Sequence, residues 1–194
     1  MIIKTILLLH ILGVLGLFAA MAVQFFCYSA LRRAENTIQA RGIFAILCKL
    51  PAMFGTSSAL IFLSGLYLSY MRYAHHETIG WVVVAVITFI ATGGISSHTG
   101  KKFSEQLISK LPQDSDQPLP LSEDFKKFAR RPKQMRAISC SFFSALGVLI
   151  LMVFRPDVLA SIIVIVISFL IGYFIFGTLR FLVKAHSLPI NQRK

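Results

Sequence analysis

The stretch LLLHILGVLGLFAAM, residues 7–21, decides the fold class because it is almost wholly apolar and carries no charged residue. A helix needs about 20 consecutive apolar residues to cross a bilayer core, and the apolar run around this stretch has that length. Of the 194 residues in the chain, 56% are hydrophobic and only 14% are charged. Soluble domains carry about a quarter charged residues. The sequence therefore predicts an all-α integral membrane protein.

Apolar runs of this kind recur along the chain. They cover residues 5–28, 50–70, 79–97, 137–154 and 158–176. Backbone groups in lipid must pair within the segment, so each run is expected to be a helix. We expect one domain, residues 1–194, that forms a polytopic transmembrane helix bundle of five spans. Small and polar residues on the first four spans predict a four-helix core, with the fifth, C-terminal helix packed outside it or at one edge.

The positions of the basic residues predict the direction of the chain. The net charge is +12, yet the Lys and Arg residues lie at the ends of apolar runs and form no nucleic-acid-binding motif, so we expect no nucleic-acid partner. With five spans, only Lys4, Arg72 and Arg155 fall on one side, and all other Lys and Arg residues fall on the other. The positive-inside rule then predicts N-out/C-in topology, with the carboxyl terminus in the cytoplasm.

The segment 99–135 between the third and fourth spans is predicted to be a basic cytoplasmic loop. Its first part, KKFSEQLISKL (101–111), places Phe103, Leu107, Ile108 and Leu111 on one helical face, so we expect it to continue the third helix along the inner membrane surface. Its last part, SEDFKKFARR (122–131), reads as a short helix capped by Ser122. The basic residues of that helix predict contact with anionic lipids at the cytoplasmic face: Lys126, Lys127, Arg130 and Arg131.

Polar and small residues are predicted to line the interior of the bundle. The stripes are His10, Gly13, Leu17, Ala20 and Gln24 on the first span, Gly55, Ser58, Phe62, Gly65 and Ser69 on the second, Thr88, Thr92 and Ser96 on the third, and Cys140, Ser144 and Gly147 on the fourth. His10 has three interpretations. It hydrogen-bonds a Ser or Thr of a neighbouring helix, it binds haem b or a metal ion, or it handles protons or a substrate near the outer side.

Two further sets of side chains could bind a metal or cofactor. His76, in the outer loop RYAHHETIGW (72–81), is a second histidine that could join His10. Cys27, Cys48, His98 and Cys140 come from four places that the topology puts near the inner surface, and three thiols with one imidazole are a competent zinc set. The alternative for the cysteines is that they are small apolar fillers facing a reducing cytoplasm. The eight acidic residues lie outside the spans, which argues against a carboxylate-driven pump.

Three motifs carry a resemblance to known proteins: LLLHILGVLGLFAAM, LIFLSGLYLSY (60–70), and MVFRPD (152–157) followed by ASIIVIVISFLIG (160–172). They resemble a family of uncharacterised bacterial integral membrane proteins, known only as a domain of unknown function. This resemblance implies that the protein lies in the bacterial inner (cytoplasmic) membrane. More distantly, they resemble copper-resistance D membrane domains and membrane-bound protoporphyrinogen oxidases. That resemblance implies a metal- or haem-associated histidine in the first span, at the position of His10. The tryptophan that usually follows this histidine in those relatives is absent here.

These observations leave the activity, and whether the protein is an enzyme, open. The leading hypothesis is a helix-bundle protein with a haem or metal site at His10. The alternative is a non-catalytic accessory or assembly subunit that binds other membrane proteins. A small-molecule transporter is a third hypothesis, although the sequence lacks the inverted repeats and broken helices typical of that class.

Overall fold

The structure is a computed structural model. It describes residues 1–73, 80–109, 111 and 119–186, with side chains at all of these except 72–73, 95–99, 101–102 and 176–186. The described elements are all helices, which confirms the predicted all-α class: α1 (Ile2–Leu31), α2 (Thr37–Leu47), α3 (Leu50–Tyr73), α4 (Gly80–Ile108), α5 (Glu123–Ala129), α6 (Pro132–Phe154) and α7 (Val158–His186).

Long apolar helices dominate the described part of the chain. Four helical stretches are long and apolar enough to cross a membrane by length and composition: Ile2–Leu31, Thr37–Met71, Glu123–Phe154 and Val158–Ile175. The described part of α4 contributes a shorter apolar stretch, Gly80–Gly94. Large apolar side chains cover the outward surfaces, and Phe26, Leu63 and Phe174 are 70%, 68% and 63% exposed. Soluble monomers rarely expose apolar patches of this extent.

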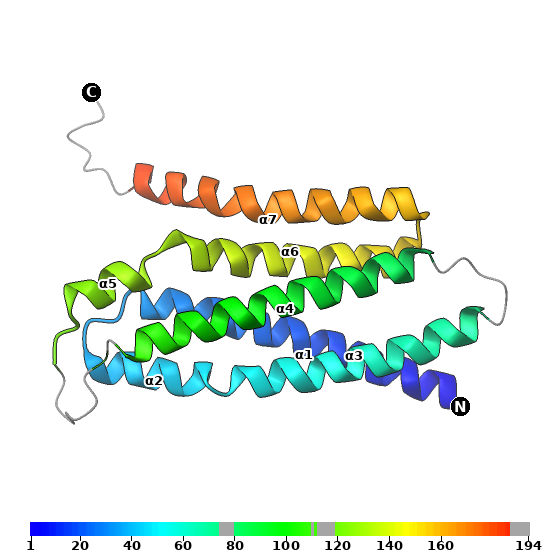
Figure 1. Cartoon of the computed structure of the whole chain (residues 1–194), viewed down its shortest axis with the longest axis horizontal. Coiled ribbons are helices and arrows are strands. Elements are labelled where there is room, and N and C mark those ends of the chain that lie inside the picture. The colour runs from blue at the N-terminus through cyan, green and yellow to red at the C-terminus, as the bar shows by residue number, and fades with distance from the viewer. Residues whose placement is uncertain (74–79, 110, 112–118, 187–194) are drawn as a thin grey trace.

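The long helices run alongside one another, and α2 and α5 lie at one end (Figure 1). The helix α1 packs mainly against α3, while α6 packs mainly against α7 and, less extensively, α4. The side chains of α1, α3, α4 and α6 meet around a small central pocket. The helix α7 contacts α6 and α4, so it lies at the edge of the group formed by the other four. We call the end that holds α2 and α5 the inner end, and the opposite end the outer end.

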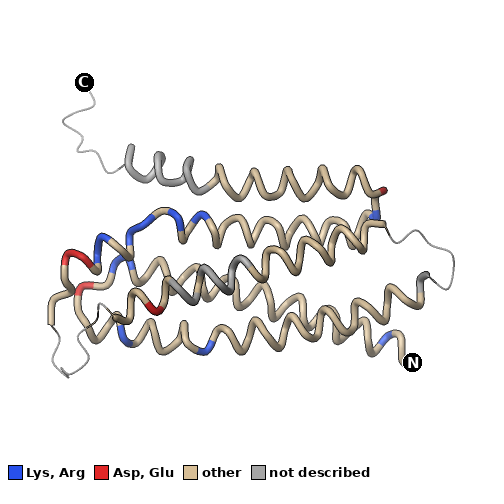
Figure 2. The backbone as a smooth tube through the Cα atoms, viewed as in Figure 1, with Lys and Arg blue, Asp and Glu red and all other residues tan. Residues whose placement is uncertain are grey.

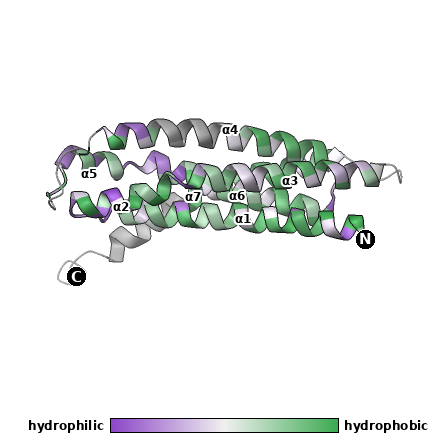
Figure 3. Cartoon of the chain, turned by 90° about the horizontal axis from the view of Figure 1, so that it is seen from below, coloured by the Kyte–Doolittle hydropathy of each residue, from purple (hydrophilic) through white to green (hydrophobic). Residues whose placement is uncertain are grey.

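Hydrophobic residues occupy the middle of the molecule, and hydrophilic residues gather around α2 and α5 (Figure 3). The described Lys and Arg residues show the same division, since most of them lie at the inner end (Figure 2). At the outer end, α6 and α7 are joined by a tight turn in which Arg155 adopts a left-handed conformation, with φ of 48°. The Asp157 carboxylate then accepts a hydrogen bond of 2.8 Å from the Ala160 amide, which is the helix cap that the sequence predicts.

The α1–α3 interface is a seam of small side chains. Buried residues of α1 recur with alternating spacings of four and three or their sum, the pattern of helices that pair in a left-handed supercoil: Gly13, Leu17, Ala20, Cys27 and Leu31. The facing buried residues of α3 are Ser57, Ile61 and Ser64. A Cβ atom on Gly13 would lie 3.1 Å from the Ile61 backbone nitrogen, so the two backbones approach closely at this point.

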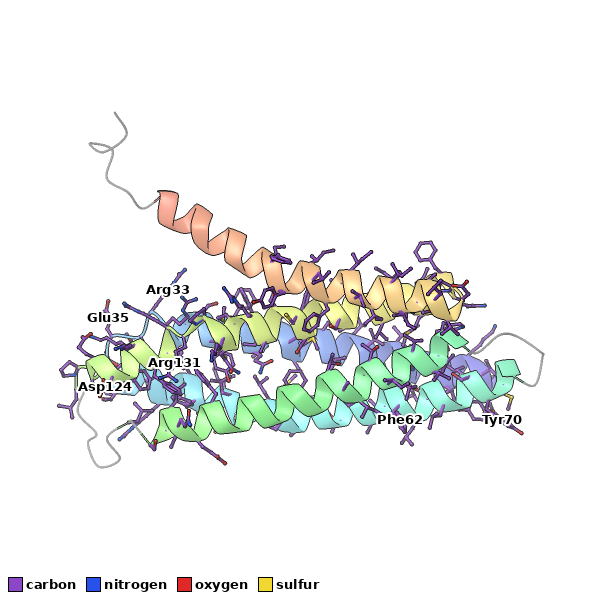
Figure 4. The ribbon with its side chains drawn as sticks, turned by 45° about the horizontal axis from the view of Figure 1, so that its top comes forward. Arg33, Glu35, Phe62, Tyr70, Asp124 and Arg131 are labelled. Atoms are coloured by element: carbon purple, nitrogen blue, oxygen red, sulfur yellow. The ribbon has the colours of Figure 1, made fainter. Side chains whose placement is uncertain are left out.

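The predicted stripe on α3 is therefore wrong by about one residue. Gly55 and Phe62 are exposed, whereas Ser57 and Ile61 are buried. Phe62 and Tyr70 project from the outer surface of α3 (Figure 4). The error has a physical cause, because both faces of a membrane-type helix are apolar and small residues occur on both. Hydropathy alone then does not identify the face that contacts protein.

A second seam joins α6 to α7. Cys140, Ser144 and Gly147 are all buried, as predicted, but Cys140 and Gly147 lie against the C-terminal helix and not at the centre of the bundle. A Cβ atom on Gly172 would lie 2.8 Å from both the Cys140 Cα and the Ser139 carbonyl oxygen. A Cβ atom on Gly147 would lie 2.7 Å from the Ser168 hydroxyl oxygen. The small residues therefore allow α6 and α7 to pack backbone against backbone.

The largest hydrophobic cluster lies at the inner end, and we call it the inner cluster. It comprises Cys27, Tyr28, Leu31, Ala40, Phe44, Leu47, Leu50, Phe103, Leu107, Leu111, Leu121, Phe125, Phe128, Ala129, Met135 and Ile138. Phe103, Leu107 and Leu111 thus face protein, which contradicts the prediction that this face of the helix lies on the membrane surface. Ile108 is 39% exposed and does not share their environment. The predicted short helix with its Ser122 cap is confirmed as α5, since the Ser122 hydroxyl accepts from the Phe125 amide.

The helix α2 was not predicted, although the sequence carries a signal for it. Asn36 accepts a hydrogen bond of 2.9 Å from the Gln39 amide, and the Gln39 side chain accepts one of 3.1 Å from the Glu35 amide. This arrangement is a variant of the capping box, in which the Gln39 side chain accepts from the residue before the N-cap and not from the N-cap itself. The segment also pairs with the α4–α5 connection, because the Thr37 amide donates to the Leu119 carbonyl at 3.0 Å. The helix ends at the turn before Pro51, which lacks an amide hydrogen to continue it.

Candidate polar site at the α1–α3 interface

The His10 side chain points into the seam between α1 and α3, as predicted. It is half-buried, and its Nδ1 atom lies 2.9 Å from the hydroxyl oxygen of Ser64, a residue that is 8% exposed. Gly65 makes room for the ring, because a Cβ atom at that position would lie 3.2 Å from the His10 Cε1 atom. The packing interpretation of His10 is therefore seen directly: its ring hydrogen-bonds a serine on the neighbouring helix.

The surroundings of Ser64 favour one tautomer of His10. The Ser64 hydroxyl also lies within hydrogen-bond distance of the Leu60 carbonyl oxygen one turn earlier in α3. When the hydroxyl donates to that carbonyl, as serines in membrane helices commonly do, its oxygen accepts from the His10 Nδ1–H. This network assigns the ring proton of His10 to the Nδ1 atom. The Nε2 atom of His10 then carries the lone pair.

Ser64 is the neighbour of His10 that the sequence pattern did not predict. Gly65 was predicted to lie on the interior stripe, and it does contact His10, but Ser64 was not included. Gly16 was also omitted, and a Cβ atom there would lie 2.5 Å from the Ser57 hydroxyl oxygen. The motif LSG at residues 63–65 is the signal, because it combines the hydroxyl that binds the ring with the glycine that admits it.

The centre of the four-helix group is apolar, which contradicts the predicted polar interior. The pocket there has a volume of about 30 Å³ and is lined by Val14, Leu17, Phe18, Ile61, Phe89, Ala145, Val148, Leu149 and Met152. Thr88 and Thr92 are satisfied within α4, since their hydroxyls donate to the Val84 and Thr88 carbonyls at 2.8 and 2.7 Å. Among the described residues, these polar side chains therefore form hydrogen bonds within one helix or between two helices, and they do not line the central pocket.

The remaining predicted ligands are distributed over the molecule. Cys27 is buried in the inner cluster, Cys48 is exposed at the α2–α3 turn, and Cys140 is buried against α7, with its sulfur 3.9 Å from the Phe169 carbonyl oxygen. The backbone of His98 belongs to α4, but its side chain lies outside the described residues, as does the whole of His76. No group of three potential metal-binding side chains occurs among the residues that the structure describes. The four-residue zinc set and the pairing of His10 with His76 stay predictions.

Comparison with known proteins supplies no relative, since no family model, no curated protein and no solved structure matches this chain. The resemblances inferred from the three sequence motifs therefore stay predictions, and the residues themselves must carry any functional conclusion.

Proposed function

We propose that the chain is a multi-pass integral membrane protein with five spans, formed by α1, α3, α4, α6 and α7, in the N-out/C-in orientation. The observation that supports this proposal is the combination of apolar outward surfaces with basic residues gathered at one end (Figure 2). Cytoplasmic ends of membrane helices carry an excess of Lys and Arg. The inner end then faces the cytoplasm, and the membrane is the inner membrane of a bacterium.

Cysteine labelling tests the orientation, because Cys48 is exposed at the inner end while Cys27 and Cys140 are buried. A variant with Cys27→Ala and Cys140→Ala keeps only the reporter thiol. We expect a membrane-impermeant maleimide to label Cys48 in inverted membrane vesicles and not in intact cells. A matched variant that lacks Cys48 and carries Lys4→Cys at the outer end should give the opposite result. Labelling of Cys48 from outside intact cells would refute the orientation.

Within this protein, we propose that His10 acts first as a packing residue that ties α1 to α3 through Ser64. The hydrogen bond of 2.9 Å and the close fit of the ring against Gly65 support this role. Such a role agrees with a non-catalytic accessory or assembly subunit, which is one of the functions that the sequence left open. Purification in mild detergent tests it, since an accessory subunit should co-purify with a defined partner. A monodisperse protein that purifies alone would count against this function.

Haem binding through His10 is a second candidate function that one observation favours. Histidines that bind metals usually have their other ring nitrogen held by a hydrogen bond, and the His10 Nδ1 is held in this way by Ser64. The fit to haem is partial, because the central pocket of about 30 Å³ is too small for a porphyrin and the described residues offer one ligand. An absorption spectrum of the protein made with ample haem tests it. A Soret band that His10→Ala abolishes supports haem binding, and a wild-type spectrum without that band removes it.

A further inference from the structure

A polar groove lies at the inner end, between the end of α4 and the start of α6. Its volume is about 490 Å³, which is within the range of pockets that bind small ligands. The lining residues are Gln106 of α4, Ser109 just after it, Asp124, Lys127 and Phe128 of α5, and Arg131 just before α6. Asp124 and Arg131 mark its position in Figure 4. The functions proposed above do not involve this groove.

The floor of the groove is rigidly positioned. Phe128 is 7% exposed and stacks on Phe103 of α4, with ring centroids 5.1 Å apart and an interplanar angle of 20°. Both rings belong to the inner cluster, to which side chains from six helices, α1 to α6, contribute. The groove therefore has one buried aromatic residue at its floor, and exposed polar and charged side chains form its walls.

Arg131 is positioned on this floor with its donors available. Its guanidinium carbon lies 4.4 Å from the centroid of the Phe128 ring. A guanidinium that stacks on an aromatic ring uses its face, which leaves the N–H donors in its plane to bind oxygen atoms. Stacking also reduces the side-chain freedom that a ligand would otherwise have to remove. Arg131 is thus prepared to bind a planar or tetrahedral oxyanion.

The charges of the groove favour an anion. Lys127 and Arg131 contribute two positive charges and Asp124 one negative charge, and no described carboxylate forms a salt bridge with either cation. The neighbouring Lys126 differs in this respect, because its ammonium lies 2.9 Å from the Glu123 carboxylate. That ion pair lowers the pKa of the exposed Glu123 carboxyl. The groove side of α5 therefore presents cations that are available to a ligand, while Lys126 is already paired.

The depth of the groove relates it to the membrane surface. The helix α4 begins at Gly80, and a helix rises 1.5 Å per residue, so a core of about 30 Å ends near residue 100. Gln106 then lies roughly 9 Å beyond the hydrocarbon, in the region where lipid head groups and their phosphates lie. This placement rests on the proposed membrane orientation. At this depth, the phosphate of a lipid head group can reach the groove.

We propose that this groove binds the phosphate of an anionic lipid head group, with Lys127 and Arg131 as the cations that contact it. A soluble phosphate ester would offer the same chemistry, so the experiment separates the two sources. The purified full-length protein in mild detergent is incubated with phosphatidic acid, with diacylglycerol of the same acyl chains, or with inorganic phosphate. Bound lipid is then counted by native mass spectrometry.

Two double variants with equal loss of charge provide the comparison. Lys127→Ala with Arg131→Ala removes the groove cations, and Lys126→Ala with Arg130→Ala removes the two residues that precede them in sequence and do not line the groove. We expect phosphatidic acid to bind the wild type and the second variant within about twofold of each other, and the groove variant at least about tenfold more weakly. Helix content and thermal unfolding confirm that both variants fold.

Each other outcome overturns a stated part of the proposal. Equal losses in both variants would mean diffuse attraction and no site. Retention of diacylglycerol as strong as that of phosphatidic acid would exclude phosphate recognition. Release of bound phosphatidic acid by millimolar inorganic phosphate, with direct binding of that phosphate, would assign the groove to a soluble ligand. Detergent micelles have no inside or outside, so these results do not depend on the orientation that Cys48 labelling tests.

Discussion

Replacing Gly172 by alanine is expected to separate α6 from α7 and to destabilise the protein. The new Cβ atom would lie 2.8 Å from the Cys140 Cα atom and from the Ser139 carbonyl oxygen, and 3.1 Å from the Cys140 amide nitrogen. Carbon atoms pack best at about 3.5–4.0 Å, so the helices must move apart by roughly 0.7–1.2 Å at this point. All three contacts are backbone atoms, which have no alternative rotamer to adopt.

The expected magnitude combines two opposing terms. Overpacking of a tight interface costs about 1–3 kcal/mol, and the loss of a helical glycine returns up to about 1 kcal/mol. We expect a net loss of about 1–2 kcal/mol in the free energy of unfolding. Gly55→Ala is the matched control, since Gly55 is an exposed glycine of α3 with no atom within 4 Å of the added Cβ. That variant should be stabilised by about 0.5–1 kcal/mol.

The assay uses the thiol at the interface as a local reporter. In a background with Cys27→Ala and Cys48→Ala, Cys140 is the remaining cysteine, and it is 8% exposed. We expect Gly172→Ala to increase the rate of Cys140 labelling in micelles and to lower the denaturant midpoint, while Gly55→Ala changes neither in that direction. Wild-type protection of Cys140 together with unchanged stability in Gly172→Ala would refute the backbone-contact interpretation of this seam.

Three further changes test other parts of the fold. A double-mutant cycle with His10→Ala and Ser64→Ala should give a coupling free energy of about 0.6–1.5 kcal/mol in micelle unfolding, and additive effects would contradict the hydrogen bond across the seam. Asn36→Ala should cost about 1 kcal/mol and speed amide exchange in α2, and unchanged exchange there would argue against the cap. Arg155→Gly should raise the thermal midpoint by relieving the left-handed backbone, a gain of about 0.5–1 kcal/mol, so a lower midpoint would disprove this interpretation.

The helices were predicted well from the sequence wherever a long apolar run is enough to identify a helix. Long apolar runs without charges give helices whose ends follow from Pro156, Asp157 and the flanking basic residues, and the structure has helices over all five runs. The inward direction of His10 was also predictable, because a polar ring shares a stripe with Gly13 and Ala20. These predictions succeed because neighbouring residues differ strongly in polarity.

The predictions failed where the faces of a helix differ little in polarity, or where segments far apart in the sequence pack together. On α3, outward-facing and protein-facing residues are equally apolar, so Ser64 was missed as the partner of His10. At the inner end, Phe103 and Phe125 are far apart in sequence, and their shared burial depends on the folding of α2 and α5 over the end of α4. A single amphipathic segment does not reveal whether membrane or protein covers its apolar face. The groove beside Arg131 depends on that same folding.

The composition of the inner cluster has a consequence for biosynthesis. It takes Tyr28 from α1, Phe44 from α2, Phe103 from α4 and Phe125 from α5, and it is completed only by Ile138 of α6. A chain that is still being translated therefore exposes these aromatic side chains to chaperones and proteases until the ribosome has released residue 138. Messages truncated before that codon should yield short-lived products, even though several long hydrophobic helices have already been made.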